Sequence, residues 1–374
     1  MKTKKIALFI SLIISLSVLS SCKKDSESNS SKINSNTTAE TTISEINKVK
    51  NTPPEEDSRF STISDNAAED FTYEVNGDNI TITGYLGELP AVGIPEKIDG
   101  KTVTTIGKYA FDGYKEPKDK EVEFSEKNNI NTILAIKLPD SVTEIQEGAF
   151  TNCYSLTAIK LSSNLQKIDE GAFACCDQLE SITIPDSVKT IGPYAFYECF
   201  ALSEAYIGNS VESIGDYAFH KCYKLMQSII PDSVKSLGVG IFSSCDYLSL
   251  VQLGDGLTVI PKDAFFSCYV LSNINLSNIT KIEENAFKSC SNLDAPSFSD
   301  KLTEVGSESF ISCTKIKSVS LPSSLEKIGE KAFGFEEDSS SGEKNKVADF
   351  SISSSLNSVA EKYAKENNIS FISK

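Results

Sequence analysis

Residues 179–199 read LESITIPDSVKTIGPYAFYEC, and close copies of this stretch follow one another through most of the chain. The copies are easiest to follow at a phenylalanine that returns every 23 residues, with a single step of 22. These residues are Phe150, Phe173, Phe196, Phe219, Phe242, Phe265, Phe287, Phe310 and Phe333. One globular core would not impose such a spacing, whereas a stack of repeated units would. The spacing therefore predicts a repeat solenoid.

Each unit predicts a short strand, a turn and a return path. Residues 181–184 (SITI) alternate polar and apolar side chains, which predicts a strand with one buried face. Residues 185–187 (PDS) predict a turn, because Pro presets its own φ and Asp and Ser bond to nearby backbone. The Ala195-Phe196 pair, with Cys199 three residues on, predicts a short helical turn that closes the coil. Stacked coils would pair strand to strand at about 4.8 Å and merge their apolar residues into one core.

The pattern L-x-x-I-x-I-P-x-S-V-x-x-I-G-x-x-A-F-x-x-C closely resembles the BspA-like leucine-rich-repeat family of bacterial surface proteins. The resemblance covers residues 92–336 as about ten repeats, and implies a leucine-rich-repeat solenoid of mainly short parallel strands with short helical turns. A charged stretch at 115–131 interrupts the repeats as an insertion. Four residues depart from the pattern and are expected to stack less well: Ser228, Pro296, Ser309 and Glu336.

Both flanks of the repeats are predicted to act as caps, which a solenoid needs for solubility. Residues 70–91 predict an N-terminal hairpin cap, with Asn76-Gly77 as the turn between alternating apolar residues. Residues 337–374 predict a loop followed by a C-terminal cap. This cap has apolar residues at helical spacing over 355–366 and a last strand over 369–372.

The first 22 residues predict a targeting segment. Lys2, Lys4 and Lys5 precede an apolar stretch over 6–19 that is too short to span a bilayer of ~30 Å. Residues 19–22 (LSSC) resemble the lipobox of bacterial lipoproteins. That resemblance implies that the signal peptide 1–21 is removed and that Cys22 carries the lipid, which anchors the protein to the outside of the cell envelope. The alternative is an uncleaved or ordinarily cleaved signal with an incidental Cys22.

Residues 22–69 predict a disordered tether. They are rich in Ser, Asn, Thr and acidic residues, with Pro53-Pro54 in the middle. Such a segment buries too little apolar surface to offset the ordering of its backbone. Its typical reach would be roughly 35–40 Å.

The charge balance argues against nucleic acid as a partner. The 374-residue chain carries 52 acidic and 36 basic residues, a formal net charge of −16. Binding to phosphate groups requires a basic stripe, and no Lys/Arg-rich run occurs beyond the N-terminus. We therefore expect no nucleic-acid partner.

Cysteine recurs at one position of the repeat. The eight cysteines there are Cys153, Cys176, Cys199, Cys222, Cys245, Cys268, Cys290 and Cys313. One thiol per coil makes a line, whereas zinc needs four ligands that converge. Parallel side chains in a ladder also point poorly for disulfides. We therefore expect no metal, and buried free thiols that pack as small hydrophobes.

Catalytic constellations are not recognisable in the sequence. His220 is the only histidine, and its repeat position is filled elsewhere by Thr151, Tyr197 and Ser243. There is no HExxH motif, and no nucleophile has a recognisable base. We therefore predict no catalytic residues, no cofactor and no enzymatic activity, with an unrecognised secreted hydrolase as the least favoured alternative.

The outward side chains of the predicted strands are the expected binding surface. An apolar patch is predicted where Tyr206, Ile229 and Leu250 fall on successive coils, flanked by Glu204, Gln227 and Gln252. The alternative is that these residues tolerate exposure or pack under a loop.

Three functions remain open from the sequence. The family resemblance implies an adhesin-like binding protein that recognises host matrix protein, other cells or glycans, and we expect it to be a monomer. The second is a structural spacer, or a recognition subunit of a surface complex without direct adhesion. The third is the hydrolase.

Overall fold

The computed structural model describes residues 51–113 and 129–374. The predicted signal peptide, Cys22 and most of the predicted insertion lie outside the described residues. In the part that is described, no helix is long and apolar enough to cross a membrane.

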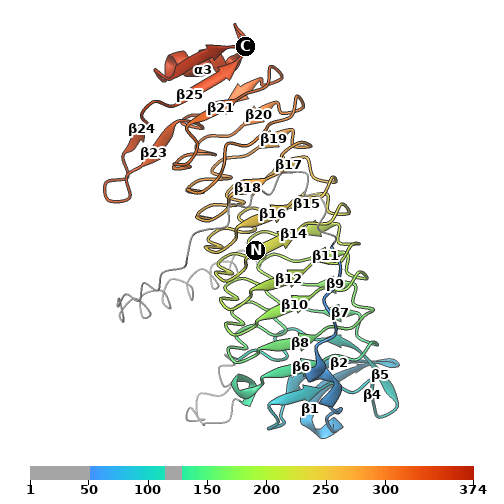
Figure 1. The fold of residues 1–374 in the computed structure, drawn as a ribbon. Helices are drawn as coiled ribbons and strands as arrows, with labels where there is room; N and C mark the ends of the chain where they lie inside the picture. The colour runs from blue at the N-terminus through green and yellow to red at the C-terminus, as the bar shows by residue number, and fades with distance from the viewer. Residues whose placement is uncertain (1–50, 114–128) are drawn as a thin grey trace, which may run out of the picture. The chain divides into compact units, whose positions relative to one another are not determined.

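The repeats form a solenoid in which each coil lies on the one before it and the strands of neighbouring coils are parallel (Figure 1). Equivalent residues are partners, so that Ser181 lies opposite Glu204 and Thr183 opposite Tyr206. This strand column, the strand face, contains β3(Ala91–Gly93), β6(Ala135–Lys137), β8(Ala158–Lys160), β10(Ser181–Thr183), β12(Glu204–Tyr206), β14(Gln227–Ile229), β16(Leu250–Gln252), β18(Asn273–Ile274) and β21(Ser318–Ser320). The predicted leucine-rich-repeat solenoid is confirmed.

A second column of mostly two-residue strands follows the Pro-Asp-Ser turn. It contains β5(Lys101–Ile106), β7(Glu144–Ile145), β9(Lys167–Ile168), β11(Thr190–Ile191), β13(Ser213–Ile214), β15(Ser236–Leu237), β17(Val259–Ile260), β19(Lys281–Ile282), β20(Glu304–Val305) and β22(Lys327–Ile328). The short β4(Lys97–Ile98) pairs with β5 in antiparallel fashion, and η3(Asn129–Thr132) leads into β6. In most of these strands a buried Ile faces the core, as its alternation with polar residues predicts.

Each coil closes through two tight turns, where the sequence predicts one short helical turn. In one coil, Ala174 N–H donates to Gly171 C=O at 3.0 Å and Cys176 N–H donates to Phe173 C=O at 3.3 Å. Each turn contains a residue with positive φ, 60° at Gly171 and 59° at Cys175. A left-handed residue cannot continue a right-handed helix, so the helical expectation is corrected here.

The phenylalanines stack through the centre of the solenoid. Successive rings from Phe111 to Phe333 have centroids 4.9–5.8 Å apart and lie nearly parallel. Phe71 and Tyr85 extend this ladder at its N-terminal end. The ladder cysteines are buried and free, as predicted.

Pro296 interrupts the strand face. Residues 295–297 form no strand, so β18 and β21 are not joined there by pairing. Proline has no N–H to donate to a ladder. At Ser228 and Ser309, by contrast, the coils still bond to their neighbours, although both buried hydroxyls lack a hydrogen-bond partner.

The predicted hairpin is present at the N-terminal end of the repeats. β1(Phe71–Asn76) pairs with β2(Asn79–Tyr85) in antiparallel fashion, and Gly77 takes φ 65° in the turn. β2 then pairs in parallel with β5, which joins the hairpin to the second strand column.

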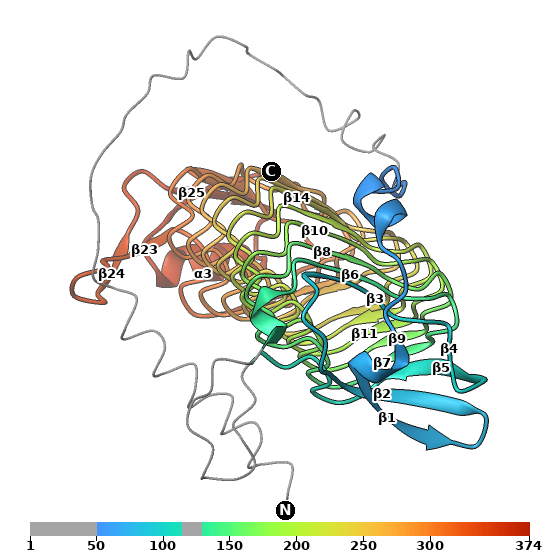
Figure 2. The same cartoon turned by 90° about the horizontal axis from the view of Figure 1, so that it is seen from below.

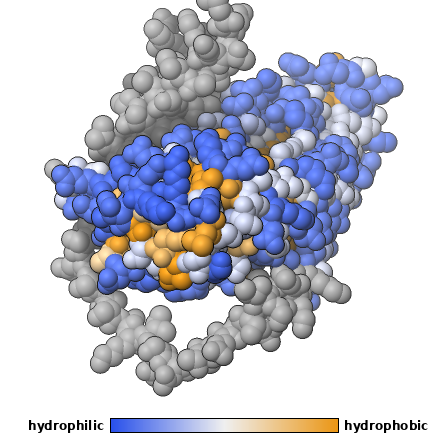
Figure 3. Space-filling model, turned by 90° about the horizontal axis from the view of Figure 1, so that it is seen from above, coloured by the Kyte–Doolittle hydropathy of each residue, from blue (hydrophilic) through white to orange (hydrophobic). Residues whose placement is uncertain are grey.

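The C-terminal end consists of β25(Ser351–Ser354), α3(Val359–Glu366) and β26(Ser370–Ser373). The Tyr363 hydroxyl of α3 accepts from Phe333 N–H at 3.0 Å and donates to Phe333 C=O at 2.9 Å, at the last ring of the ladder. Leu356 and Ile372 stay 61% and 55% exposed. Seen from above, apolar residues gather in the middle of the molecule and hydrophilic residues surround them (Figure 3).

The loop predicted from residue 337 is instead a hairpin of β23(Phe335–Glu337) and β24(Lys344–Lys346). Its turn is ordered by Asp338, whose carboxylate accepts from Ser340 N–H at 2.8 Å and Ser341 N–H at 3.1 Å. An Asp side chain that bonds the following backbone N–H groups favours a turn.

Residues 51–69, which the sequence assigned to the tether, pack on the outside of the stacked coils (Figure 2). They include η1(Ser58–Thr62) and most of η2(Ala68–Asp70). Phe60 and Ile63 are buried with Ala135 and Ala158. The prediction of disorder is corrected for this part of the tether, because these two apolar side chains bury surface that the composition alone did not reveal.

Candidate binding groove on the strand face

The stacking of the coils places four residues of the predicted patch together, although β12 and β14 are not joined by strand pairing. Tyr206 and Ile229 occupy equivalent positions of the neighbouring strands β12 and β14, as do Glu204 and Gln227. Both apolar side chains are half-buried, and both polar side chains are exposed. The proximity of Tyr206 to Ile229, and of Glu204 to Gln227, follows from the 23-residue repeat together with the period-2 alternation of side chains in strands.

Leu250 and Gln252 lie one strand further along. Leu250 lies opposite Gln227 and Asn273, in the other outward column from Tyr206 and Ile229. Both Leu250 and Gln252 are half-buried and neither lines the groove described below. The predicted six-residue patch is therefore divided by the structure.

A groove with a volume of about 680 Å³ runs over the strand face from β8 to β14. Its floor includes Ile159, Ile182 and Ala205, and Tyr206 and Ile229 line it from the outward column. One side is formed by residues 51–57 and Phe60 of the same chain. Lys160 and Glu204 supply charges of opposite sign to its lining.

Tyr206 is fixed by hydrogen bonds in this groove. Its hydroxyl donates to Asp186 Oδ1 at 3.1 Å and accepts from Asn209 Nδ2 at 2.9 Å. Asp186 Oδ1 also accepts from Asn209 N–H at 2.6 Å. Burial, together with the negative charge of Asp186, raises the pKa of Tyr206 to about 12. Tyr206 therefore presents a neutral, held ring at physiological pH.

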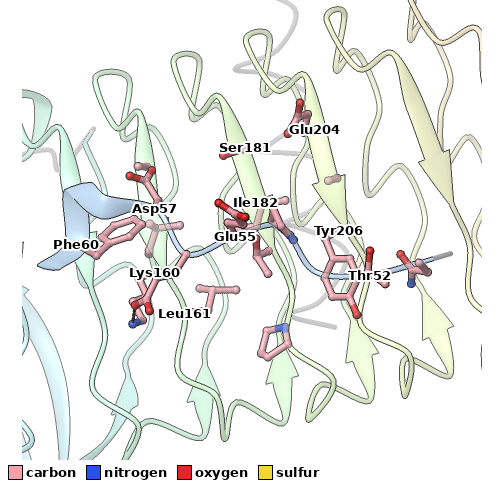
Figure 4. Close-up of a pocket in the computed structure, with 18 of the residues that line it drawn as sticks. Thr52, Glu55, Asp57, Phe60, Lys160, Leu161, Ser181, Ile182, Glu204 and Tyr206 are labelled. Carbon is pink, nitrogen blue, oxygen red and sulfur yellow. Dashed lines mark hydrogen bonds and ion pairs between the residues drawn. The ribbon is translucent and has the colours of Figure 1, made fainter. Parts of the chain in front are cut away.

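Residues 51–57 (NTPPEED), here called the strap, cross the strands above the groove. In Figure 4 the strap runs from Thr52, at the Tyr206 end, toward Phe60 at the opposite end. Asn51 Nδ2 donates to Ile207 C=O at 2.7 Å and to Asn209 Oδ1 at 3.1 Å. Glu56 forms an ion pair with Lys160 of β8. The alternative that the patch residues pack under a loop therefore applies to Tyr206, which the strap passes.

The comparisons with known proteins identify the repeat. Residues 120–249 and 212–338, together more than half of the chain, match the model of the BspA type leucine rich repeat region, which has six copies. The chain belongs to this BspA-type family. None of the curated proteins compared with the BspA-type chain matches it.

Several solved structures are similar to this BspA-type chain. A leucine rich repeat protein of T. pallidum is 25% identical, with 67% of this chain and 90% of that chain covered and a TM-score of 0.44. A leucine rich cell surface protein of Faecalibacterium prausnitzii is 23% identical, with 78% and 89% covered and a TM-score of 0.42. The pneumococcal vaccine antigen PcpA is 20% identical, with 84% and 98% covered and a TM-score of 0.42.

His220 of the BspA-type chain lies in an aromatic cluster away from the groove. Its ring stacks on Tyr197 at 5.1 Å and meets Tyr217 edge-on at 5.6 Å. Burial, with a smaller effect of Lys221, lowers the pKa of His220 to about 4. Within residues 51–113 and 129–374, no three His, Cys, Asp or Glu side chains are grouped so as to hold a metal ion.

The strap is the part of the site that sequence reasoning missed. Its only signal is the pair Phe60 and Ile63, the two large apolar residues in an otherwise polar stretch. The spacing of three places them on one side of a helical turn, and the structure forms that turn as η1.

Proposed function

We propose that this BspA-type chain is a cell-surface binding protein that recognises an extracellular protein or glycan through the groove on its strand face. The observation that carries the proposal is the groove itself, in which the half-buried Tyr206 and Ile229 lie among exposed polar side chains. Tyrosine combines apolar contact area with a polar handle, and such residues are enriched where proteins bind partners.

The coil stack supports this role mechanically. Equivalent strand residues are fixed in register by the pairing of coils, as Gln227 is opposite Leu250 and Ile229 opposite Gln252. Side chains on such a ladder need little ordering when a partner arrives, which lowers the entropic cost of binding.

Attachment of the protein to the envelope through lipidated Cys22 belongs to the same proposal. The supporting sequence features are the basic residues, the apolar stretch and LSSC over 19–22. A Cys22→Ala variant of the full chain is expected to move from the membrane fraction to the soluble fraction of the producing cells. Recovery of that variant in the membrane fraction, in the same amount as wild type, would argue against lipid anchoring.

Binding is tested with the full chain displayed on the producing cells. The cells are applied to immobilised host matrix proteins and cell-wall glycans, and bound cells are counted. The double variant Tyr206→Asp and Ile229→Asp is expected to reduce binding at least tenfold. Tyr247→Asp is the matched control, because Tyr247 is 64% exposed and lies outside the groove lining.

Thermal unfolding and surface expression of each variant establish that the solenoid is intact. Equal binding by the folded double variant and wild type would overturn the groove as the site. Wild-type cells that bind none of the immobilised materials would favour the spacer instead.

A further inference from the structure

The strap crosses the strand face as an extended polypeptide and forms one side of the groove. Pro53 and Pro54 favour an extended backbone for the strap, since proline fixes φ and restricts the residue before it. The five-residue step from Asn51 to Glu56 spans about 15 Å in this conformation. This is long enough to cross from the coil of Ile207 to β8, two steps of about 4.8 Å along the stack.

The strap is held by side chains at its two ends. Asn51 bonds to Ile207 C=O and Asn209, and Glu56 pairs with Lys160. In the described part of the chain, no main-chain group of residues 51–56 bonds to a strand of the solenoid. Residues 52–56 are all exposed. An exposed ion pair stabilises weakly, so the strap can leave the groove at small cost.

The next residues hold the chain firmly. Phe60 and Ile63 are buried against Ala135 and Ala158, with Ala91 packed beside them. Asn66 then joins the chain to β3. Its N–H donates to Gly93 C=O at 2.8 Å, and its Oδ1 accepts from Gly93 N–H at 3.0 Å. Asp57 caps η1 by accepting from Arg59 N–H, so residues 51–56 can swing away about Asp57 without disturbing the coils.

A lifted strap leaves complementary groups unpaired in the groove. Lys160 loses its carboxylate partner, and the Ile207 carbonyl and the Asn209 side chain lose the Asn51 amide. The ring of Tyr206 lies at the Asn209 end of the groove, and the side chain of Ile229 lies one coil beyond it. A ligand that restores these contacts needs a carboxylate at one end, an amide donor at the other and an extended backbone between.

We infer that the groove binds an extended acidic polypeptide of another molecule, and that the strap is the intramolecular occupant which such a ligand displaces. The inference rests on the proposed function and names its ligand class and its regulation. A tethered occupant acts at an effective concentration in the millimolar range, so even a weakly held strap is expected to compete with a free peptide.

The test uses the full chain and a fluorescent peptide with the strap sequence, NTPPEEDSRF, as the probe. Anisotropy is measured for wild type and for a Glu56→Lys variant, which replaces the ion pair with Lys160 by repulsion. We expect Glu56→Lys to bind the probe at least tenfold more tightly than wild type. Lys160→Glu is expected to abolish probe binding, and a scrambled peptide should not bind to any variant.

A charge swap provides the matched control. The double variant Glu56→Lys and Lys160→Glu restores the intramolecular pair with reversed charges, so it should bind the acidic probe no better than wild type. Thermal unfolding confirms that each variant is folded, and Lys160→Gln serves as a milder version of Lys160→Glu.

The inference is overturned if Glu56→Lys leaves probe affinity unchanged, or if folded Lys160→Glu and Lys160→Gln bind the probe as wild type does. The inference would also be overturned if a polyuronate displaced the strap while the peptide probe did not bind. If the cells bind immobilised material equally well when Glu56 or Lys160 is replaced, this inference is wrong and the proposed function stands. If the probe binds in a strap-dependent way but the cells bind no immobilised material, the proposed function fails and the inference about the groove stands.

Discussion

The Sγ of Cys222 donates a hydrogen bond to the main-chain carbonyl of Phe196, 3.3 Å away in the preceding coil. The same carbonyl accepts from Cys199 N–H within its own coil, also at 3.3 Å. The relationship recurs along the ladder, with Sγ to carbonyl distances of 3.0–3.3 Å from Cys153 to Cys313. Each thiol therefore links two coils as well as filling space between them.

Replacing Cys222 with alanine is expected to destabilise the protein by about 1–2 kcal/mol. The loss combines a weak S–H···O bond with a small cavity, and the Phe196 carbonyl keeps its bond from Cys199 N–H. Urea unfolding followed by circular dichroism measures the change. Unchanged stability would show that the thiol contributes neither bond nor packing.

The ladder thiols are expected to resist alkylation in the folded protein. Burial raises the pKa of Cys176, Cys199, Cys222, Cys245 and Cys290 well above the usual range, so the reactive thiolate is scarce. Mass spectrometry after iodoacetamide treatment should find these residues unmodified in buffer and modified in guanidinium chloride. Rapid labelling in buffer would contradict the buried ladder.

Phe219→Ala is expected to lower the free energy of unfolding by about 3–5 kcal/mol, because it removes a fully buried ring from the middle of the ladder. The rings of Phe196 and Phe242, at 5.1 and 5.6 Å, would both lose a stacking partner. Tyr247→Ala, at an exposed position, should change the free energy of unfolding by less than about 0.5 kcal/mol. Similar effects of the two substitutions would be incompatible with the stacked core.

The stack could be predicted from the sequence because every coil repeats the same contacts. A Phe and a Cys at constant spacing are enough to place the ring ladder and the thiol ladder, since each unit meets only its neighbours. The left-handed conformation of the turn residues could not be predicted from the sequence. Tyr194 takes φ 56° and Tyr217 φ 54° where other coils have glycine, so their side chains carry no sign of the backbone that the stack imposes.

The groove was predicted in part for a related reason. Tyr206 and Ile229 are neighbours because strand register follows from the repeat, which the sequence shows. The strap depends instead on contacts made once, between Phe60 and Ala135 or Ala158, far apart in the chain. No period marks such contacts, and the polar composition of residues 51–59 conceals them.

Glu308→Gln is expected to loosen the β23–β24 hairpin without unfolding the solenoid. Glu308 pairs with Lys288 at 3.2 Å and with Lys344 of β24, and Lys288 also pairs with Glu337 of β23 at 2.5 Å. Hydrogen exchange over residues 335–346 should become faster, while exchange in β13 and β15 stays unchanged. The exposed Glu343→Gln is the control, and equal exchange in the two variants would show that the ion pairs do not hold the hairpin.

His220→Tyr is expected to raise the stability of the protein at pH 5 relative to its stability at pH 7. Burial lowers the pKa of His220 to about 4 from its usual value of about 6.5, so the unfolded chain binds this proton more readily than the folded chain. His220 therefore stabilises the fold above pH 6.5, relative to lower pH, and this stability is lost as pH falls from about 6.5 toward 4. Tyrosine fills the equivalent position at Tyr197 and preserves the stack on it.

The measurement is urea unfolding of wild type and His220→Tyr at pH 7 and pH 5. Asp177 has its pKa raised to about 6 by burial and by Glu198, so Asp177 binds its proton more readily in the folded chain. It stabilises the fold as pH falls and opposes His220 over the same range. Wild type should therefore change little between the two pH values, whereas His220→Tyr should become more stable at pH 5, since the raised pKa values of Asp177, Glu170 and Asp246 then act without an opposing histidine. An identical pH response of the two proteins would contradict a neutral, buried imidazole at this position.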